Sequence, residues 1–175
     1  MKKIGISFLI VAIIILTGLG LTTYSGAENK EYLRIHIRAN SNMNEDQEVK
    51  YQVKSAVVSY LTPYIAECKT KKMAEEMLKT KKADIENVCD KVLEKNNFSY
   101  KSHAEVRNEQ FPTRVYNGLE LQSGYYDALI IELGSGRGDN WWCVVYPPLC
   151  FTKGNMNYVY KSKIFEIIED FKKRR

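Results

Sequence analysis

Residues 32–39 alternate between polar and apolar side chains without a break. This period of two is typical of a strand with one buried face and one outward face. The next strand-like segment begins only near residue 98, so the strand must pair with partners far along the chain; otherwise its apolar face would stay in water. The apolar positions are Leu33, Ile35, Ile37 and Ala39, and the polar positions are Tyr32, Arg34, His36 and Arg38.

The chain then changes to the three- and four-residue period of amphipathic helices. We expect helices at about 45–66, 70–79 and 83–96, with Thr70 capping the second. Pro63 lies inside the first and is expected to kink it or end it early, because proline has no amide donor and clashes one turn back. The positions expected to face the core are Val49, Val53, Ala56, Val57, Tyr60, Leu61, Tyr64, Met73, Met77, Leu78, Ile85, Val88, Cys89, Val92 and Leu93.

The second half of the chain returns to strand-like patterns. We expect strands at 98–106, at 111–116 continued by 119–121, at 125–133 and at 141–146, a glycine-rich turn at 134–140, and a helix at about 161–172. A strand, a group of helices, a run of strands and a final helix together predict an α+β fold. Its mostly antiparallel sheet would have four to five strands, covered on one face by two to four helices.

Residues 1–27 have the composition of an export signal. Lys2 and Lys3 precede the apolar run Ile4–Leu21, and small residues follow up to Ala27. A membrane-spanning helix needs about 20 apolar residues, and this run lies at the low end of the workable range. A retained anchor is therefore the alternative to a cleaved signal peptide. In both cases we expect residues 28–175 to be translocated as a single domain.

The charge balance argues against a nucleic-acid partner. The chain has 26 Lys and Arg residues against 21 Asp and Glu residues, a formal net charge of +5, and two of the lysines belong to the leader. Many of the remaining lysines lie beside acids on predicted helices, as Lys71 and Lys72 do beside Glu75 and Glu76. This pattern is typical of a solvated helical face.

The four cysteines suit an oxidising compartment. Cys143 and Cys150 flank Pro147 and Pro148, whose bend favours a disulfide that would stabilise the fold by roughly 2–3 kcal/mol. Cys68 and Cys89 fall on different predicted helices, as a second pair or as small core side chains. The sequence has no C-x-x-C and no close Cys/His pair, so we expect no metal site.

Neither of two possible catalytic arrangements has a convincing sequence pattern. A cysteine nucleophile at Cys143 or Cys150 would need a histidine base, and only His36 and His103 exist. A glycosidase-like carboxylate pair would have to come from Asp127, Glu132 and Asp139. The glycine-rich turn leads into a strand, whereas a phosphate-binding loop leads into a helix. We therefore expect neither a catalytic site nor a cofactor.

Four sequence blocks behind the leader are distinctive. They read LRIHIRANS at 33–41, FPTRVYNG at 111–118, GYYDALIIELGSGRGD at 124–139 and NWWCVVYPPLCF at 140–151. In this order they resemble the stage II sporulation protein R family of endospore-forming bacteria. The resemblance covers about residues 32–151, with the helical middle matching only in kind.

The resemblance implies a signalling role. Such proteins are made in the forespore and exported into the space between the forespore and mother-cell membranes. There they activate a membrane-embedded aspartic protease, which removes the pro-sequence of the mother-cell sigma factor E. We expect partner contacts at Arg34, His36 and Arg38, which take outward positions on a predicted strand, and at Trp141 and Trp142. Adjacent strand residues point to opposite faces, so one tryptophan can enter the core while the other lies outside or under another element. An exported cell-wall hydrolase or wall-binding protein is the alternative.

Overall fold

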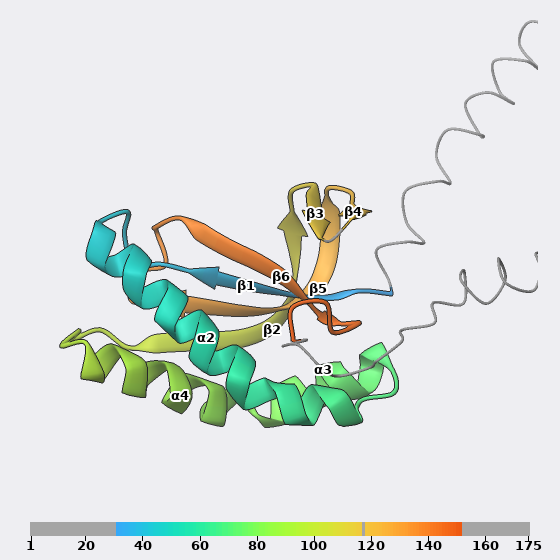
Figure 1. The fold of residues 1–175 in the computed structure, drawn as a ribbon, viewed down its shortest axis with the longest axis horizontal. Helices are drawn as coiled ribbons and strands as arrows, with labels where there is room; N and C mark the ends of the chain where they lie inside the picture. Colours follow the sequence, from blue (N-terminus) through green and yellow to red (C-terminus); the bar gives the residue numbers. More distant parts are fainter. Residues whose placement is uncertain (1–30, 117, 152–175) are drawn as a thin grey trace, which may run out of the picture.

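The computed structural model describes residues 31–116 and 118–151, so the leader and the helix expected at 161–172 lie outside the described residues. The elements are β1 (Leu33–Arg38), α2 (Asn44–Glu67), α3 (Lys71–Thr80), α4 (Lys82–Lys95), β2 (Ser102–Phe111), β3 (Arg114–Tyr116), β4 (Leu119–Leu121), β5 (Gly124–Leu133) and β6 (Asn140–Tyr146). In this part of the chain, three helices pack on one face of a four-stranded sheet (Figure 1). The predicted α+β class is confirmed.

Strand β1 lies inside the sheet, as its alternation required. The strand order is β2-β5-β1-β6. β1 pairs parallel with β5 and antiparallel with β6, and β2 pairs antiparallel with β5. Both partners of β1 come from the second half of the chain. The sheet is therefore mostly antiparallel, and the long-range pairing of the first strand is confirmed.

Each helix contributes one stripe of buried side chains to the main core. Helix α2 buries a residue at nearly every turn, from Val49 to Ile65. The expectation that Pro63 could end this helix early was wrong, because α2 continues to Glu67. Pro63 is exposed, so water can reach the carbonyl group that its missing amide leaves unpaired, while Leu61 and Ile65 stay packed on the core. Thr70 caps α3 as predicted, accepting a hydrogen bond from the Met73 amide.

Two strand boundaries differ from the sequence prediction. β2 begins at Ser102 rather than Phe98, because the chain is still leaving helix α4: the Phe98 amide donates to the Leu93 carbonyl. β2 also runs on to Phe111, through polar residues that give no alternation signal.

The segment expected to form one broken strand at 111–116 and 119–121 instead folds back on itself. β3 and β4 form a separate two-stranded hairpin in which Arg114 pairs with Leu121 and Tyr116 with Leu119. Gly118 has a φ of 87°, which glycine accepts without strain. The hairpin stands at the end of the sheet where β1 begins (Figure 1).

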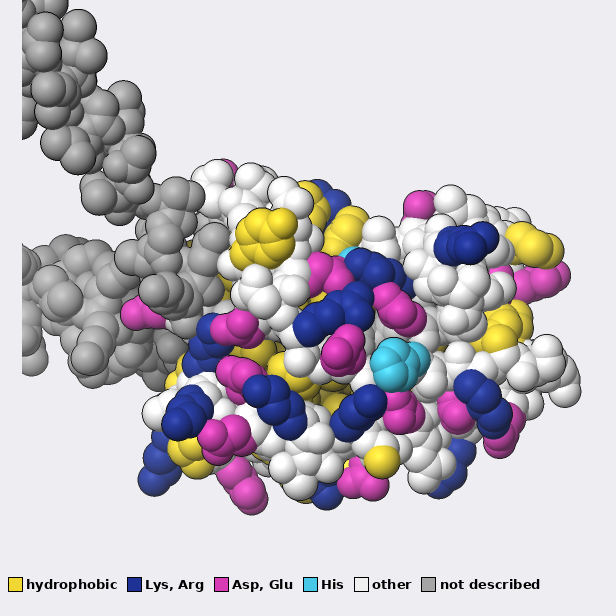
Figure 2. Space-filling model, turned by 180° about the vertical axis from the view of Figure 1, so that it is seen from behind, with side chains coloured by type: hydrophobic (Ala, Val, Ile, Leu, Met, Phe, Trp, Pro, Cys, Tyr) yellow, Lys and Arg dark blue, Asp and Glu magenta, His cyan; other side chains and the backbone are white. Residues whose placement is uncertain are grey.

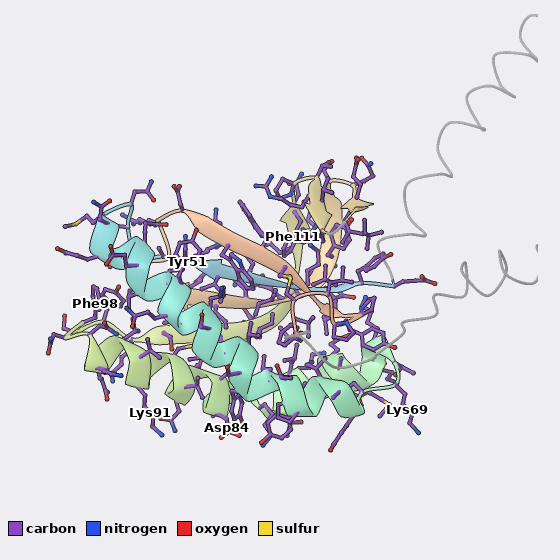
Figure 3. All side chains as sticks on the ribbon, in the orientation of Figure 1. Tyr51, Lys69, Asp84, Lys91, Phe98 and Phe111 are labelled. Atoms are coloured by element: carbon purple, nitrogen blue, oxygen red, sulfur yellow. A yellow bond between two sulfur atoms is a disulfide. The ribbon has the colours of Figure 1, made fainter. Side chains whose placement is uncertain are left out.

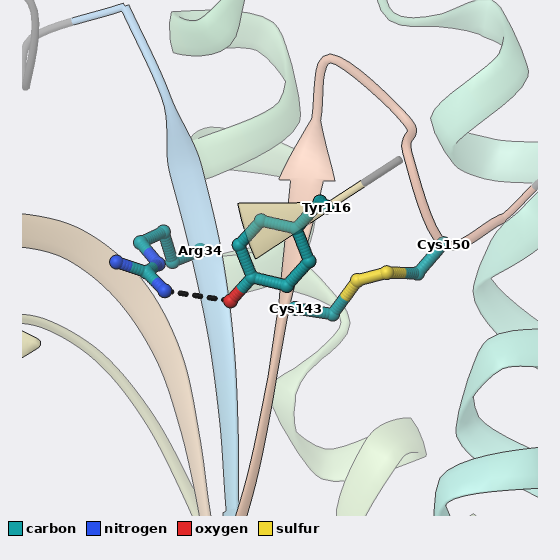
Figure 4. Close-up of a disulfide and its surroundings, with 4 residues drawn as sticks. All are labelled: Arg34, Tyr116, Cys143 and Cys150. Atoms are coloured by element: carbon teal, nitrogen blue, oxygen red, sulfur yellow. Dashed lines mark hydrogen bonds between the residues drawn. A yellow bond between two sulfur atoms is a disulfide. The ribbon is translucent and has the colours of Figure 1, made fainter. Parts of the chain in front are cut away.

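Cys143 and Cys150 form the expected disulfide, with their Cα atoms 6.3 Å apart. Figure 4 shows it joining β6 to the segment that follows. Cys68 and Cys89 are free thiols in this structure, and burial raises the pKa of the Cys89 thiol to about 12. Of the helices in the described ranges, none combines the length and apolarity that crossing a bilayer requires.

Candidate functional site

The two faces of the sheet differ in character. The face under the helices is apolar, whereas within the described residues no helix covers the opposite face, here called the open face. Charged side chains of both signs intermingle on this side of the molecule (Figure 2). The pairing register assigns the following described residues to the open face: Arg34, His36 and Arg38 of β1; His103, Glu105, Arg107, Glu109 and Phe111 of β2; Tyr126, Ala128, Ile130 and Glu132 of β5; Asn140, Trp142 and Val144 of β6.

Arg34 points to this face, but it is completely buried. Its guanidinium carbon lies 4.2 Å from the ring centroid of Phe111, 4.7 Å from that of Tyr126 and 5.6 Å from that of Tyr116. Nη2 donates a 2.6 Å hydrogen bond to the Tyr116 hydroxyl (Figure 4). Figure 3 shows Phe111 where the sheet meets the hairpin. The expectation that Arg34 would be outward and accessible is therefore wrong, because aromatic rings and the hairpin cover it.

Two nitrogens of Arg34 have no hydrogen-bond partner among the described residues. Nε and Nη1 are both buried and unpaired. A buried donor without an acceptor costs about 1–3 kcal/mol, and more when it is charged. The aromatic rings offset part of this cost, since a cation–π contact contributes roughly 0.5–2 kcal/mol. Among the described residues, no carboxylate forms an ion pair with this positively charged side chain.

His36 is also covered, with 4% of its surface exposed. Its Nδ1 lies 2.7 Å from Glu109 Oε1 and its Nε2 lies 2.8 Å from Asn140 Oδ1. The imidazole also packs on the rings of Trp142 and Phe111. Burial lowers the pKa of His36 below its ordinary value, although the contact with Glu109 acts in the opposite direction.

A half-buried ion-pair network surrounds Glu109. Arg38 donates to Glu109 at 2.9 Å and to Glu132 at 2.6 Å. Arg107 bonds the other oxygen of Glu109 at 2.9 Å and also reaches Glu132. Burial alone would raise the pKa of Glu109, but the hydrogen bonds from Arg107 and His36 outweigh it and lower that pKa. The network is internally paired and holds β1, β2 and β5 in register.

The two tryptophans lie on opposite faces of β6, as their adjacency in a strand required. Trp142 is on the open face, where Arg114 of the hairpin stacks 4.2 Å from its ring centroid. Trp141 is on the helix face, with Lys54 of α2 5.8 Å from its ring. Both are partly exposed. Because β6 is an outer strand of the sheet, the two rings flank one edge of the domain.

A comparison with known protein families settles the relationship of the chain. The family model described as stage II sporulation protein R matches residues 29–156. The chain belongs to this family. Stage II sporulation protein R of Bacillus subtilis (strain 168) is 32% identical over 119 residues, covering 68% of this chain and 53% of the relative. The chain thus spans about half the length of that curated relative. No solved structure matches it.

In this member of the stage II sporulation protein R family, the described residues do not form the cysteine–histidine pair considered above. Cys143 is consumed in the disulfide and lies on the helix face, whereas His36 lies on the open face. His103 belongs to β2, at the other edge of the sheet.

Asp127 and Glu132 do not form the carboxylate pair either. Asp127 and Glu132 lie on opposite faces of β5. Asp127 is bound to Lys71 at 2.6 Å, and Glu132 is bound to Arg38. The Asp139 backbone carbonyl accepts a hydrogen bond from Lys50, and this residue lies in the turn between β5 and β6.

Sequence reasoning missed three residues of the site: Glu109, Phe111 and Tyr116. Glu109 stands in a polar stretch that shows no alternation. The sequence pattern predicts that Phe111 begins the next strand and that Tyr116 lies in a sheet strand. In the structure, Tyr116 belongs to the hairpin and reaches Arg34, which is 82 positions away. The family motif FPTRVYNG contains Phe111 and Tyr116, so the resemblance was the available signal for them.

Proposed function

We propose that this chain is an exported sporulation signal that activates a membrane-embedded aspartic protease, leading to the processing of pro-sigma-E in the mother cell. The membership in the stage II sporulation protein R family carries this proposal. On this proposal the chain is not an enzyme: it is a protein ligand, and the protease supplies the chemistry.

The arrangement of the open face supports binding rather than catalysis. Its carboxylates are tied to Arg38 and Arg107, and His36 is tied to Glu109, so none of them is presented as a nucleophile or as a general base. A ligand of this kind activates only if it binds the active state of the protease more tightly than the inactive state. The rigid sheet would supply such a preformed binding surface.

The contact surface is proposed to run along the β6 edge. A partner that covers this edge touches Trp141 from one side and Trp142 from the other, and Arg38 lies on the neighbouring strand. Partly exposed tryptophans are frequent anchors of protein interfaces. Arg34 and His36, also expected at the interface, would support this surface from beneath, because they are buried.

The compartment is part of the same proposal. Residues 1–27 would carry residues 28–175 through the forespore membrane as one domain, as a cleaved signal or as a retained anchor. The product would then act in the space between the forespore and mother-cell membranes. The disulfide between Cys143 and Cys150 is consistent with that location, since such bonds persist in oxidising compartments.

Co-expression in a non-sporulating bacterium tests the proposal. The full chain, the protease and pro-sigma-E are produced together, and cleavage of pro-sigma-E is followed by immunoblot. We expect cleavage with the full chain and none with a chain lacking residues 1–27, because that chain stays on the wrong side of the membrane. Absence of cleavage with the full chain would refute direct activation. Hydrolysis of purified cell wall by the chain would instead support the hydrolase alternative.

The anchor role of the β6 edge is tested by Trp142→Ala. We expect this variant to lose pro-sigma-E cleavage while it still folds, as judged by circular dichroism. The matched control is Tyr125→Ala, which removes an aromatic side chain that is 64% exposed and lies on β5, away from the β6 edge. Normal cleavage with Trp142→Ala would remove the edge from the interface.

A further inference from the structure

The unpaired guanidinium of Arg34 needs a ligand. Arginine has five N–H donors, and Nε and Nη1 together carry three of them. Both nitrogen atoms are buried, and none of the three N–H groups has an acceptor among the described residues. The Tyr116 hydroxyl binds only Nη2, and the three aromatic rings contact the faces of the cation without satisfying its N–H groups.

The hairpin that contacts Arg34 carries a second cation. Arg114 of β3 stacks on Trp142, and its one hydrogen bond to a described residue goes to the Thr113 carbonyl. Within residues 31–116 and 118–151, neither Arg34 nor Arg114 makes an ion pair with a carboxylate. This end of the sheet therefore carries uncompensated positive charge, in contrast to the paired network around Glu109.

Part of the cover over Arg34 is the separate hairpin β3–β4. β3 and β4 pair only with each other and do not join the four-stranded sheet. Two-stranded hairpins are marginally stable alone. Arg114 and Tyr116 point from β3 toward the sheet, and the side chain between them, Val115, is 62% exposed. Arg114 and Tyr116, together with the buried Leu121 of β4, hold the hairpin against this end of the domain.

We propose that Arg34 is a receptor for a carboxylate of the partner protein, an acidic side chain or a chain terminus, and that the hairpin β3–β4 moves aside to admit it. A carboxylate accepts several N–H bonds at once and neutralises the guanidinium, so it satisfies the donors that the closed structure leaves empty. The identity of the partner rests on the proposed function, whereas the carboxylate preference does not.

Anion titration of the full chain tests the receptor directly. The Nε–H resonance of Arg34 is identified by nuclear magnetic resonance as the signal that Arg34→Met removes. We expect sodium acetate to shift it and sodium chloride at equal ionic strength to leave it in place. Tyr116→Phe should respond at lower acetate concentration, because it loosens the hairpin and frees Nη2.

Three outcomes of the titration would overturn the proposal. The first is an equal response to acetate and chloride. The second is an acetate response that Tyr116→Phe does not sharpen. The third is a stronger response to sodium phosphate than to acetate, because that result would assign the site to a phosphate group, such as a lipid head group, instead of a protein carboxylate.

The pro-sigma-E cleavage assay is the second test of this proposal. We expect Arg34→Met to reduce cleavage of pro-sigma-E roughly 10- to 100-fold, the effect of losing a charged hydrogen-bonding partner. Its melting temperature should stay equal or rise, because an apolar side chain replaces a buried unpaired charge. Full activity in Arg34→Met, or a loss of activity that accompanies a fall in melting temperature, would assign Arg34 a purely structural role. No cleavage with the wild-type chain would refute the proposed function, and the acetate titration would still decide the receptor.

Discussion

His36 lies at the junction between the ion-pair network and the aromatic part of the open face. One ring nitrogen contacts Glu109, the acid shared by Arg38 and Arg107, and the other contacts Asn140 on β6. Its faces pack against Trp142 and Phe111. A proton added to this ring must be accommodated where little water is present, which is why burial lowers its pKa. The residue therefore couples the stability of the open face to pH.

We predict that the free energy of unfolding falls as the pH drops below about 6.5, where a histidine in the unfolded chain becomes protonated. The folded His36 takes up its proton only at lower pH, so the unfolded state binds more protons in this window and is favoured. Chemical denaturation of the full chain between about pH 7 and 5.5 measures the slope. His36→Gln should flatten it.

His103→Gln is the matched control for this prediction, because the side chain of His103 is 59% exposed and lies on the outer strand β2. It should retain the wild-type slope. Glu109 and the other acids with a lowered pKa change protonation at lower pH. They therefore do not contribute to the slope between about pH 7 and 5.5. An unchanged slope in His36→Gln would show that the histidine is not the responsible group.

At the scale of elements, the turn between β5 and β6 is bound to the loop between β1 and α2. The Gly138 amide donates to the Ala39 carbonyl at 2.8 Å, and the Asp139 amide donates to the Asn42 side chain at 2.6 Å. Lys50 of α2, which is buried, donates to the Asp139 carbonyl. These bonds fix β6 beside β1 and so fix the edge that carries both tryptophans.

Gly138→Ala should therefore destabilise the fold. A Cβ atom at this position would stand 2.2 Å from the Ser41 backbone oxygen, and a backbone group cannot turn away as a side chain can. We expect a loss of about 1–3 kcal/mol in the free energy of unfolding, measured by urea denaturation. Arg137→Ala, at the exposed neighbouring position, should stay within about 0.5 kcal/mol of wild type. Equal midpoints for the two variants would contradict the close approach.

The elements that could be predicted from the sequence have either a regular period or a continuous apolar run. β1, α2, α3 and α4 fall within a few residues of their expected bounds because their apolar positions repeat regularly, and β5 and β6 do so because each contains a continuous apolar run. β2 and the hairpin β3–β4 do not, since residues 107–110 are all polar and Phe111 closes one strand instead of opening the next. The sequence period indicates which face of the sheet a side chain lies on, but it does not indicate what covers that face. The burial of Arg34 could therefore not be predicted from the sequence.

For the whole molecule, the domain has two differently built sides around one sheet. The helix side is an apolar core, and the open side combines a smaller aromatic cluster, Phe111, Tyr126, Ala128 and Ile130, with the ion-pair network. Because β1 pairs with β5 and β6, neither side is complete until the second half of the chain has folded back. The disulfide closes the segment after β6, the last strand of the sheet, and its redox state reports where the folded chain resides.

Thiol counting in the native host tests the proposed export of the whole molecule. After denaturation without reduction, the full chain should react with an alkylating reagent at Cys68 and Cys89 only, because Cys143 and Cys150 are bonded. A chain lacking residues 1–27 should react at all four cysteines, since the cytosol keeps thiols reduced. Cys150→Ala in the full chain is the control and should show three reactive thiols. Four reactive thiols in the full chain would place it in a reducing compartment and contradict export.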